Sequence, residues 1–291
     1  MSRHQCFRDA FGEDLANRSI RQDQSLKRCF GVSKNVSHCD WEYLQNVTML
    51  DEPHERVPKL TDLLEFLAQP ENEQLWAFLD VKVSKPSFAN CYCCELYINR
   101  EKLLNDPVAI VPQIAKTIAS VPHAANKPWH TRLVVGCWAS SFIPLIMEHL
   151  PEYRIALVCF DLRAARRFFT IPNLVAYNVN QQVLMGPWER DFLDEARAAG
   201  KKVFVWTVNS ERAMQWCIRK NVDGVVTDHP DLCRQLIGKE GPATTPGSDM
   251  KITFSEKVTI FKISLLVAMF GWIFSLKFLP RVKSVKTAEA K

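Results

Sequence analysis

Polar and aromatic residues lie at the ends of two short apolar runs, and side chains of these types can bind a cation and a phosphate group. Asp80 and Lys82 close the run LWAFLDVKV, and residues two apart on a strand share one face. A carboxylate placed there can hold a cation while the neighbouring ammonium group neutralises a phosphate. The same pattern also fits a buried ion pair at a strand end. Trp206 and Asn209 close the second run, KVFVWTVN.

The stretch 202–230 has the order strand, helix, strand. KVFVWTVN is followed by SERAMQWCIRKN, whose apolar residues recur at helical spacing, and then by VDGVVTDHP, which carries Thr227 and Asp228. Such a stretch of about 30 residues forms a parallel βαβ unit. Because α/β folds place their chemistry at the carboxyl ends of parallel strands, these polar residues are candidates for a site. An ordinary strand pair of a barrel or of a Rossmann fold fits the same pattern.

Apolar, β-branched runs alternate with helical segments from residue 75 onward. The pattern predicts strands at 75–83, 133–138, 154–160, 174–180, 202–208 and 222–227. Repeated strand–helix units of this length imply a parallel sheet with right-handed crossovers. A complete (β/α) barrel has eight strands. The sequence therefore predicts an α/β fold, a TIM-type barrel truncated to about six of eight strands, with the missing strands at the N-terminus.

The phrases VFVWTVN and DGVVTDHP together resemble the last two barrel strands of the glycerophosphodiester phosphodiesterase family, and more narrowly its fungal phosphatidylglycerol phospholipase C branch. The resemblance covers about residues 23–237 apart from an insertion. Further matches to a run of that family are Asp23, Leu26, Lys27, Arg28, Asp40 and Trp41. The resemblance implies metal-assisted hydrolysis of a glycerophospholipid to diacylglycerol and glycerol phosphate, with phosphatidylglycerol as the candidate substrate.

The resemblance also implies roles for the matching residues. Asp80 is the implied metal ligand, for Ca²⁺ or Mg²⁺. Lys82 is the implied catalytic and phosphate-binding cation, and Trp206 a wall of the substrate pocket. Asp23 is implied to be catalytic by orienting its neighbour, but that neighbour is Gln22 where the family has a histidine.

Two motifs of the family have no counterpart in the chain, namely a His-Arg-Gly phrase after the first strand and a Glu-x-Asp phrase after the second. Arg3-His4 has the wrong order, and Glu13-Asp14 lies in a polar run. A glutamine cannot exchange a proton near neutral pH, and losing one acid–base group costs about 10²–10⁴-fold in rate. The alternative function is therefore a catalytically inactive, membrane-tethered barrel that binds an anionic lipid or a partner protein.

The N-terminal part of the domain and one insertion depart from the regular pattern. Residues 1–22 are predicted to be irregular, and either residues 1–30 cover the open edge of the sheet or the complete protein has more residues upstream. The insertion 84–106 is either a lid over the site or retained intronic sequence. Its CxxC lacks a second pair at zinc-site spacing, and the ten cysteines, without a signal peptide, are predicted to be reduced.

The C-terminal part is predicted to attach the domain to a membrane. A linker at 238–257 precedes the apolar run 258–279, which as a helix spans about 33 Å, enough to cross a bilayer. The alternative is a buried helix of the domain. A single C-terminal span leaves the domain in the cytosol, on the mitochondrial outer membrane, the ER or a lipid droplet.

The net charge of +5 lies mostly in the tail, where the basic segment 280–291 follows Lys277. The rest of the chain is nearly neutral, so no nucleic-acid partner is expected. The basic tail itself favours an anionic lipid surface. The oligomeric state stays open.

Overall fold

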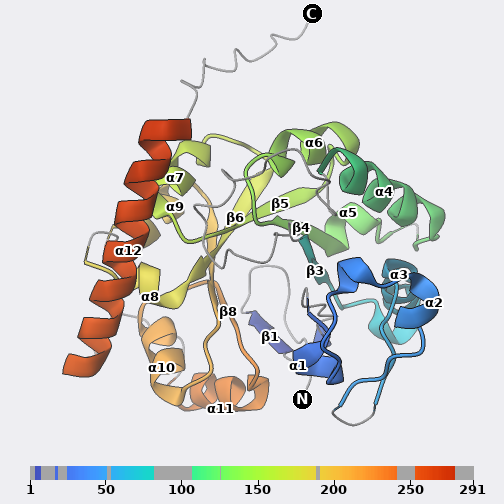
Figure 1. Cartoon of the computed structure of the whole chain (residues 1–291), viewed down its shortest axis with the longest axis horizontal. Coiled ribbons are helices and arrows are strands. Elements are labelled where there is room, and N and C mark those ends of the chain that lie inside the picture. The colour runs from blue at the N-terminus through green and yellow to red at the C-terminus, as the bar shows by residue number, and fades with distance from the viewer. Residues whose placement is uncertain are drawn as a thin grey trace, which may run out of the picture.

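The computed structural model describes residues 4–7, 17–18, 25–50, 54–81, 107–124, 126–187, 191–240 and 253–278. Its centre is a curved sheet with helices along its outside (Figure 1). The strand order is β2-β1-β8-β7-β6-β5-β4-β3. Six of the described strands run parallel: β3 (Ala77–Val81), β4 (Leu133–Cys137), β5 (Arg154–Cys159), β6 (Leu174–Asn180), β7 (Lys202–Trp206) and β8 (Gly224–Val226).

These six strands confirm the predicted α/β half-barrel. Each lies inside its predicted range. Four of them are one to three residues shorter than predicted, because end residues such as Trp138 and Phe160 have no ladder pair in the described sheet. Neighbours in sequence are neighbours in the sheet, with Asp80 paired to Gly136 and Asn178 paired to Phe204. Parallel pairing in this order brings the carboxyl ends of all six strands to one rim.

The N-terminal residues form two short strands that the sequence does not predict. β1 (His4–Phe7) pairs antiparallel with β8, and β2 (Asn17–Arg18) pairs antiparallel with β1. The prediction of an irregular segment at 1–22 is therefore wrong for these residues. The pairing occurs because a parallel edge strand such as β8 offers unpaired backbone groups, and β1 satisfies them. The N-terminal residues thus cover the β8 edge, whereas β3 is the last strand at the other edge of the described sheet.

Helices pack on the convex outside of the sheet (Figure 1). The longer ones are α3 (Leu60–Ala68), α4 (Pro107–Ser120), α6 (Phe142–His149), α9 (Phe192–Ala198), α10 (Glu211–Arg219) and α11 (Pro230–Glu240). The short ones are α1 (Lys27–Phe30), α2 (Trp41–Leu44), α5 (Trp129–Arg132), α7 (Leu162–Ala165) and α8 (Gln181–Leu184). The large core between helices and sheet contains Tyr177 and Phe192, which are fully buried.

Alternate residues of the strands face the hollow side of the sheet. A second, smaller core there consists of Trp76, Val134, Ala156, Ala176 and Phe204. Their strand neighbours, such as Tyr177 and Val205, belong to the outer core instead. Since side chains alternate along a strand, residues two positions further on also face inward, which places them at the carboxyl rim. This inner core is the floor beneath the candidate site.

Gly136 on β4 lies where the inner face of the sheet leaves no room for a side chain. A Cβ built at Gly136 would lie 2.0 Å from Cε1 of Phe78, so alanine does not fit without moving a ring of the inner face. Overpacking of this kind typically costs about 1–3 kcal/mol. We expect Gly136→Ala to lower the free energy of unfolding in urea by that amount.

Gly238→Ala is the matched control for this variant. Gly238 lies in α11 with nothing within 4 Å of a built Cβ, so alanine there should be neutral or stabilising by about 0.5–1 kcal/mol. Equal midpoints for the two variants would contradict the packing described for Gly136.

The C-terminal helix α12 (Phe254–Phe278) runs along one side of the domain, past α7, α9 and α8 (Figure 1). Ile260 and Ser264 are buried on its inner face, and a Cβ at Gly186 would lie 2.3 Å from the Ser264 hydroxyl. Arg212 pairs with Glu256 at 3.2 Å. One face of the helix thus packs against the domain, whereas Phe261 and Leu266 on it are exposed, so it is not the buried helix of the alternative.

Two predictions about the C-terminal part need correction. Because α11 extends to Glu240 and α12 begins at Phe254, the predicted linker at 238–257 is too long at both ends. Among the described residues, no helix is both long and apolar enough to cross a membrane, so the predicted transmembrane helix at 258–279 is not supported. The basic segment 280–291 lies outside the described residues.

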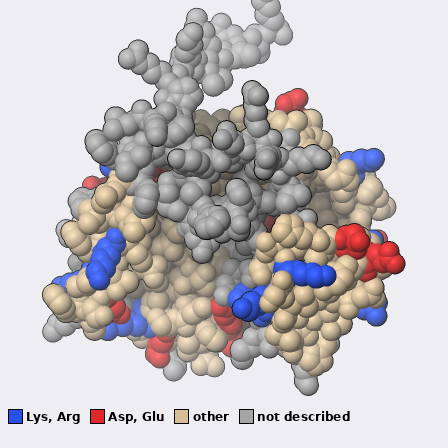
Figure 2. Space-filling model, in the orientation of Figure 1, with Lys and Arg blue, Asp and Glu red and all other residues tan. Residues whose placement is uncertain are grey.

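Charged side chains on the face drawn in Figure 2 are dispersed. Lys and Arg alternate with Asp and Glu across the described surface, with uncharged area between them (Figure 2). Pairs such as Lys127 with Glu73, 3.3 Å apart, are typical of the described surface. Such exposed pairs contribute about 0–1 kcal/mol each.

Candidate active site

One carboxylate and three aromatic rings meet at the carboxyl rim of the half-barrel. Asp80 is on β3, Trp138 directly follows β4, Phe160 directly follows β5, and Trp206 ends β7. Each lies an even number of residues beyond an inward-facing residue of its strand, such as Trp76 or Phe204, so each faces the hollow side. We call these four residues the rim cluster.

The rim cluster is held together by ring contacts and one hydrogen bond. The indole Nε1 of Trp138 donates to Oδ1 of Asp80 at 2.5 Å. The ring of Trp206 packs edge-to-face with those of Trp138 and Phe160, at centroid distances of 5.2 and 5.0 Å. Such pairs contribute about 0.5–1.5 kcal/mol each beyond area burial. All three rings are half-buried, so they form an apolar wall beside a fixed carboxylate.

Asn178 lies directly below this wall, on β6. The indole Nε1 of Trp206 donates to the backbone carbonyl of Asn178 at 3.0 Å. The Asn178 side chain is 7% exposed, and its carboxamide oxygen has no hydrogen-bond partner among the described residues. An unsatisfied buried acceptor typically costs about 1–3 kcal/mol, so this oxygen is unusual for a stable core.

A second polar group at the rim ties β7 to β8. The Asn209 carboxamide donates to Oδ2 of Asp228 at 2.7 Å and accepts from the Asp228 backbone N–H at 2.9 Å. The Thr227 hydroxyl accepts from the backbone N–H of His229 at 3.0 Å. Because these side chains hydrogen-bond to one another and to the local backbone, we interpret them as a structural link between the ends of β7 and β8.

Two of the four predicted site residues lie in the part of the chain that the structure describes. Asp80 and Trp206 lie in the rim cluster and are joined through Trp138, whereas Asp23 and Lys82 lie outside the described residues. The predicted insertion 84–106 also lies outside them. Sequence reasoning missed Trp138 and Phe160, although the signal was present, because each stands at the end of a predicted strand in phase with inward-facing residues.

The described residues do not complete a metal site. Among them, no group of three or more His, Cys, Asp or Glu side chains is placed to hold an ion. Asp80 supplies one carboxylate, and one of its oxygens already accepts from Trp138. Ca²⁺ takes 6–8 oxygen ligands and Mg²⁺ about six. The metal site predicted at Asp80 thus stays a prediction that requires ligands from other residues, and no reaction step is derived from it.

Cys137 lies beside the rim cluster but does not suit nucleophilic chemistry. Burial, together with the negative charge of Asp80, raises the pKa of the Cys137 thiol to about 12. At neutral pH the group is therefore an un-ionised thiol, and the thiolate is the reactive form. Burial also raises the pKa of Cys217. These two thiols act as small apolar side chains.

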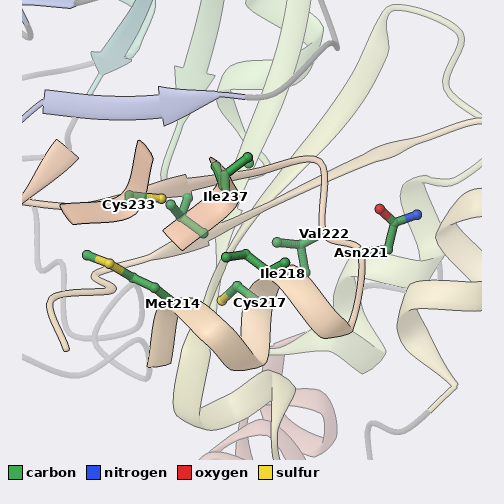
Figure 3. A pocket seen from close by; sticks show the side chains of 9 residues that line it. Met214, Cys217, Ile218, Asn221, Val222, Cys233 and Ile237 are labelled. Carbon is green, nitrogen blue, oxygen red and sulfur yellow. The ribbon is translucent and has the colours of Figure 1, made fainter. Parts of the chain in front are cut away.

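A small cavity lies far from the rim, between α10, α11 and the amino end of β8 (Figure 3). Its volume is about 30 Å³, and its lining is mainly apolar, with Met214, Cys217 and Ile237 among the residues that point toward it (Figure 3). That volume suits about one water molecule. We therefore assign the candidate site to the rim cluster and treat this cavity as a packing gap.

Comparisons with known proteins identify the family and the fold of the chain. The model of the "Glycerophosphoryl diester phosphodiesterase family" matches residues 20–232. A comparison with curated protein sequences gives no match. Similar solved structures include a glycerophosphodiester phosphodiesterase from Parabacteroides distasonis, with a TM-score of 0.54 and 14% identity over 76% of this chain and 77% of that one. At this identity the likeness shows the fold.

Two further solved structures have the same fold. The glycerophosphodiester phosphodiesterase from Agrobacterium tumefaciens has a TM-score of 0.51 and 14% identity, over 74% of this chain and 79% of that one. A phosphodiesterase from Oleispira antarctica, solved in complex with the product sn-glycerol-3-phosphate, has a TM-score of 0.51 and 16% identity, over 75% and 78%. The half-barrel is thus of the TIM type found in these enzymes.

Proposed function

Because the chain belongs to the glycerophosphoryl diester phosphodiesterase family, we propose that it hydrolyses a glycerophosphodiester at the rim cluster. The observation that carries the proposal is the contact between Asp80 and Trp138, which fixes a carboxylate beside an aromatic wall at the carboxyl rim. In barrels of this type the chemistry takes place at that rim. Enzymes of this family typically use a divalent metal, and the proposed ion here is Ca²⁺ or Mg²⁺.

The rim residues suit the two ends of such a substrate. In the reaction, water forms a new P–O bond, the P–O bond to the alcohol breaks, and a proton passes from the water to the alcohol. Asp80 is the carboxylate that can accept a proton or bind a cation there. Trp206 and Phe160 offer ring faces to the C–H groups of the glycerol moiety and exclude water. Lys82 is proposed to neutralise the phosphate, and Asp23 to assist proton transfer.

The proposed substrate is a glycerophospholipid, phosphatidylglycerol in particular. Support comes from the resemblance to phosphatidylglycerol-cleaving enzymes in the phrases around Trp206 and Thr227, and from the relative solved with sn-glycerol-3-phosphate. The products would be diacylglycerol and glycerol phosphate. We further propose that the domain acts from the cytosol on a membrane surface. The basic residues Arg281, Lys283 and Lys286, which suit an anionic lipid, support that location.

A lipid panel tests this substrate choice. Purified full-length protein is mixed with vesicles of phosphatidylglycerol, phosphatidylcholine or phosphatidylethanolamine, and diacylglycerol is measured by mass spectrometry. We expect diacylglycerol from phosphatidylglycerol at a rate at least about tenfold above the others, since a pocket that hydrogen-bonds hydroxyl groups rejects headgroups without them. Equal rates would contradict the headgroup choice. Binding of phosphatidylglycerol vesicles without hydrolysis would contradict the proposed activity and support the inactive, lipid-binding alternative.

A further inference from the structure

The carboxamide oxygen of Asn178 faces the hollow side of the half-barrel, immediately below the rim cluster. Ala176, two residues earlier on β6, belongs to the inner core, whereas Tyr177 and Val179 belong to the outer core. Strand alternation therefore turns the Asn178 side chain inward. Asn178 also pairs in register with Phe204, the inner-core residue two positions before Trp206. Asn178 and Trp206 thus occupy successive levels of the same inner surface.

Two observations at Asn178 point to a missing hydrogen-bond donor. The side chain is 7% exposed, yet its carboxamide oxygen has no hydrogen-bond partner in the part of the chain that the structure describes. The other asparagine near the end of β6 is fully used, because the Asn180 side chain accepts from the backbone N–H groups of Gln182 and Val183 as the N-cap of α8. Buried polar groups are almost always paired, so an unpaired acceptor facing a candidate site indicates a ligand or a bound water.

We propose that Asn178 is a specificity-determining residue whose carboxamide oxygen accepts a hydrogen bond from a hydroxyl group of the glycerol moiety. The inference rests on the proposed function and deepens it. The chemistry of the surroundings supports a polyol, because ring faces of Trp206 and Phe160 suit its C–H groups while acceptors on Asp80 and Asn178 suit its O–H groups. The half-buried Trp206 indole donates to the backbone carbonyl of Asn178, so a ring face and the carboxamide acceptor lie next to each other on the inner surface.

The test compares two small phosphates that differ in one hydroxyl. Isothermal titration calorimetry measures the dissociation constants of sn-glycerol 3-phosphate and of 3-hydroxypropyl phosphate, which lacks the secondary hydroxyl, with the full-length protein. For the wild type we expect the hydroxyl to strengthen binding about tenfold or more, because its absence leaves a buried acceptor unpaired. For Asn178→Leu and Asn178→Ser the difference between the two ligands should fall to about twofold or less.

Asn173→Ala is the matched control, at the opposite end of the same strand. The Asn173 side chain donates to the carbonyl of Pro151 and is remote from the rim, so the wild-type preference should remain. Circular dichroism checks that each variant is folded, and the wild-type comparison stands even where a variant is not.

The outcomes separate this inference from the proposed function. If wild type binds both phosphates with equal affinity, or if Asn178→Leu keeps the full preference, the role of Asn178 is overturned while the function stands. If the wild type binds neither phosphate and hydrolyses no glycerophosphodiester, the proposed function fails, and the inference fails with it.

Discussion

Asp80→Ala is expected to lower the rate of glycerophosphodiester hydrolysis by about 100-fold or more without unfolding the protein. Asp80 is the carboxylate of the rim cluster, and a positioned group that handles a proton in the transition state contributes about 10²–10⁴-fold. The side chain is exposed at the rim rather than part of either core, so its loss removes little packing. The measurement is kcat/KM for a soluble glycerophosphodiester, with the unfolding midpoint recorded in parallel.

Asp80→Asn separates charge from geometry in the same assay. The asparagine oxygen can still accept from the Trp138 indole, so the rim keeps its arrangement while the negative charge is lost. We expect this variant to be nearly as inactive as Asp80→Ala. Asp194→Ala is the control, because Asp194 is a largely exposed carboxylate of α9 whose ion pair with Arg197, at 2.9 Å, lies on the surface and contributes little. If Asp80→Asn retained full activity, a catalytic role for the charge would be excluded.

Phe192→Ala is expected to lower the free energy of unfolding by about 3–5 kcal/mol, the range for deleting a buried aromatic side chain. Phe192 is fully buried at the start of α9. Its ring contacts those of Tyr177 and Phe169 at centroid distances of 5.6 and 5.7 Å. Arg166 lies over its face, 5.4 Å from the centroid. Urea unfolding followed by circular dichroism measures the change.

Phe254→Ala makes the same chemical change where no core exists. Phe254 is 83% exposed at the start of α12, so its removal should alter the free energy of unfolding by less than about 0.5 kcal/mol. A small effect at Phe192, or similar effects at both positions, would contradict the packing of α9 on β6.

The parallel strands could be predicted because burial on both faces of a sheet demands continuous apolar residues. LVVGC and RIALVC are such continuous apolar runs, and they form β4 and β5. The strand order followed from the short crossovers between them. The site was predicted where a polar residue interrupted such a run, as at Asp80, or where an aromatic one matched a known phrase, as at Trp206.

The remaining features depend on contacts that no local pattern encodes. HQCF forms β1 because the edge of β8 lies open beside it, not because its residues favour a strand. The place of Trp138 at a strand end could be read from the sequence, but its hydrogen bond to Asp80 depends on the pairing of β3 with β4. The segment 258–279 was predicted to span a membrane because of its apolar length. Its environment depends instead on how α12 packs on the domain, where Ser264 lies against Gly186. Tertiary contacts decided each of these outcomes.

The most direct test of the account is phosphorus NMR of the purified full-length protein incubated with glycerophosphoglycerol. Since the rim cluster is proposed to cleave a phosphodiester beside glycerol, we predict that the diester resonance is replaced by that of glycerol phosphate in wild type and persists in Asp80→Ala. A diester resonance unchanged in wild type, with Ca²⁺ or Mg²⁺ supplied, would contradict the account and leave a phosphodiesterase fold without phosphodiesterase activity.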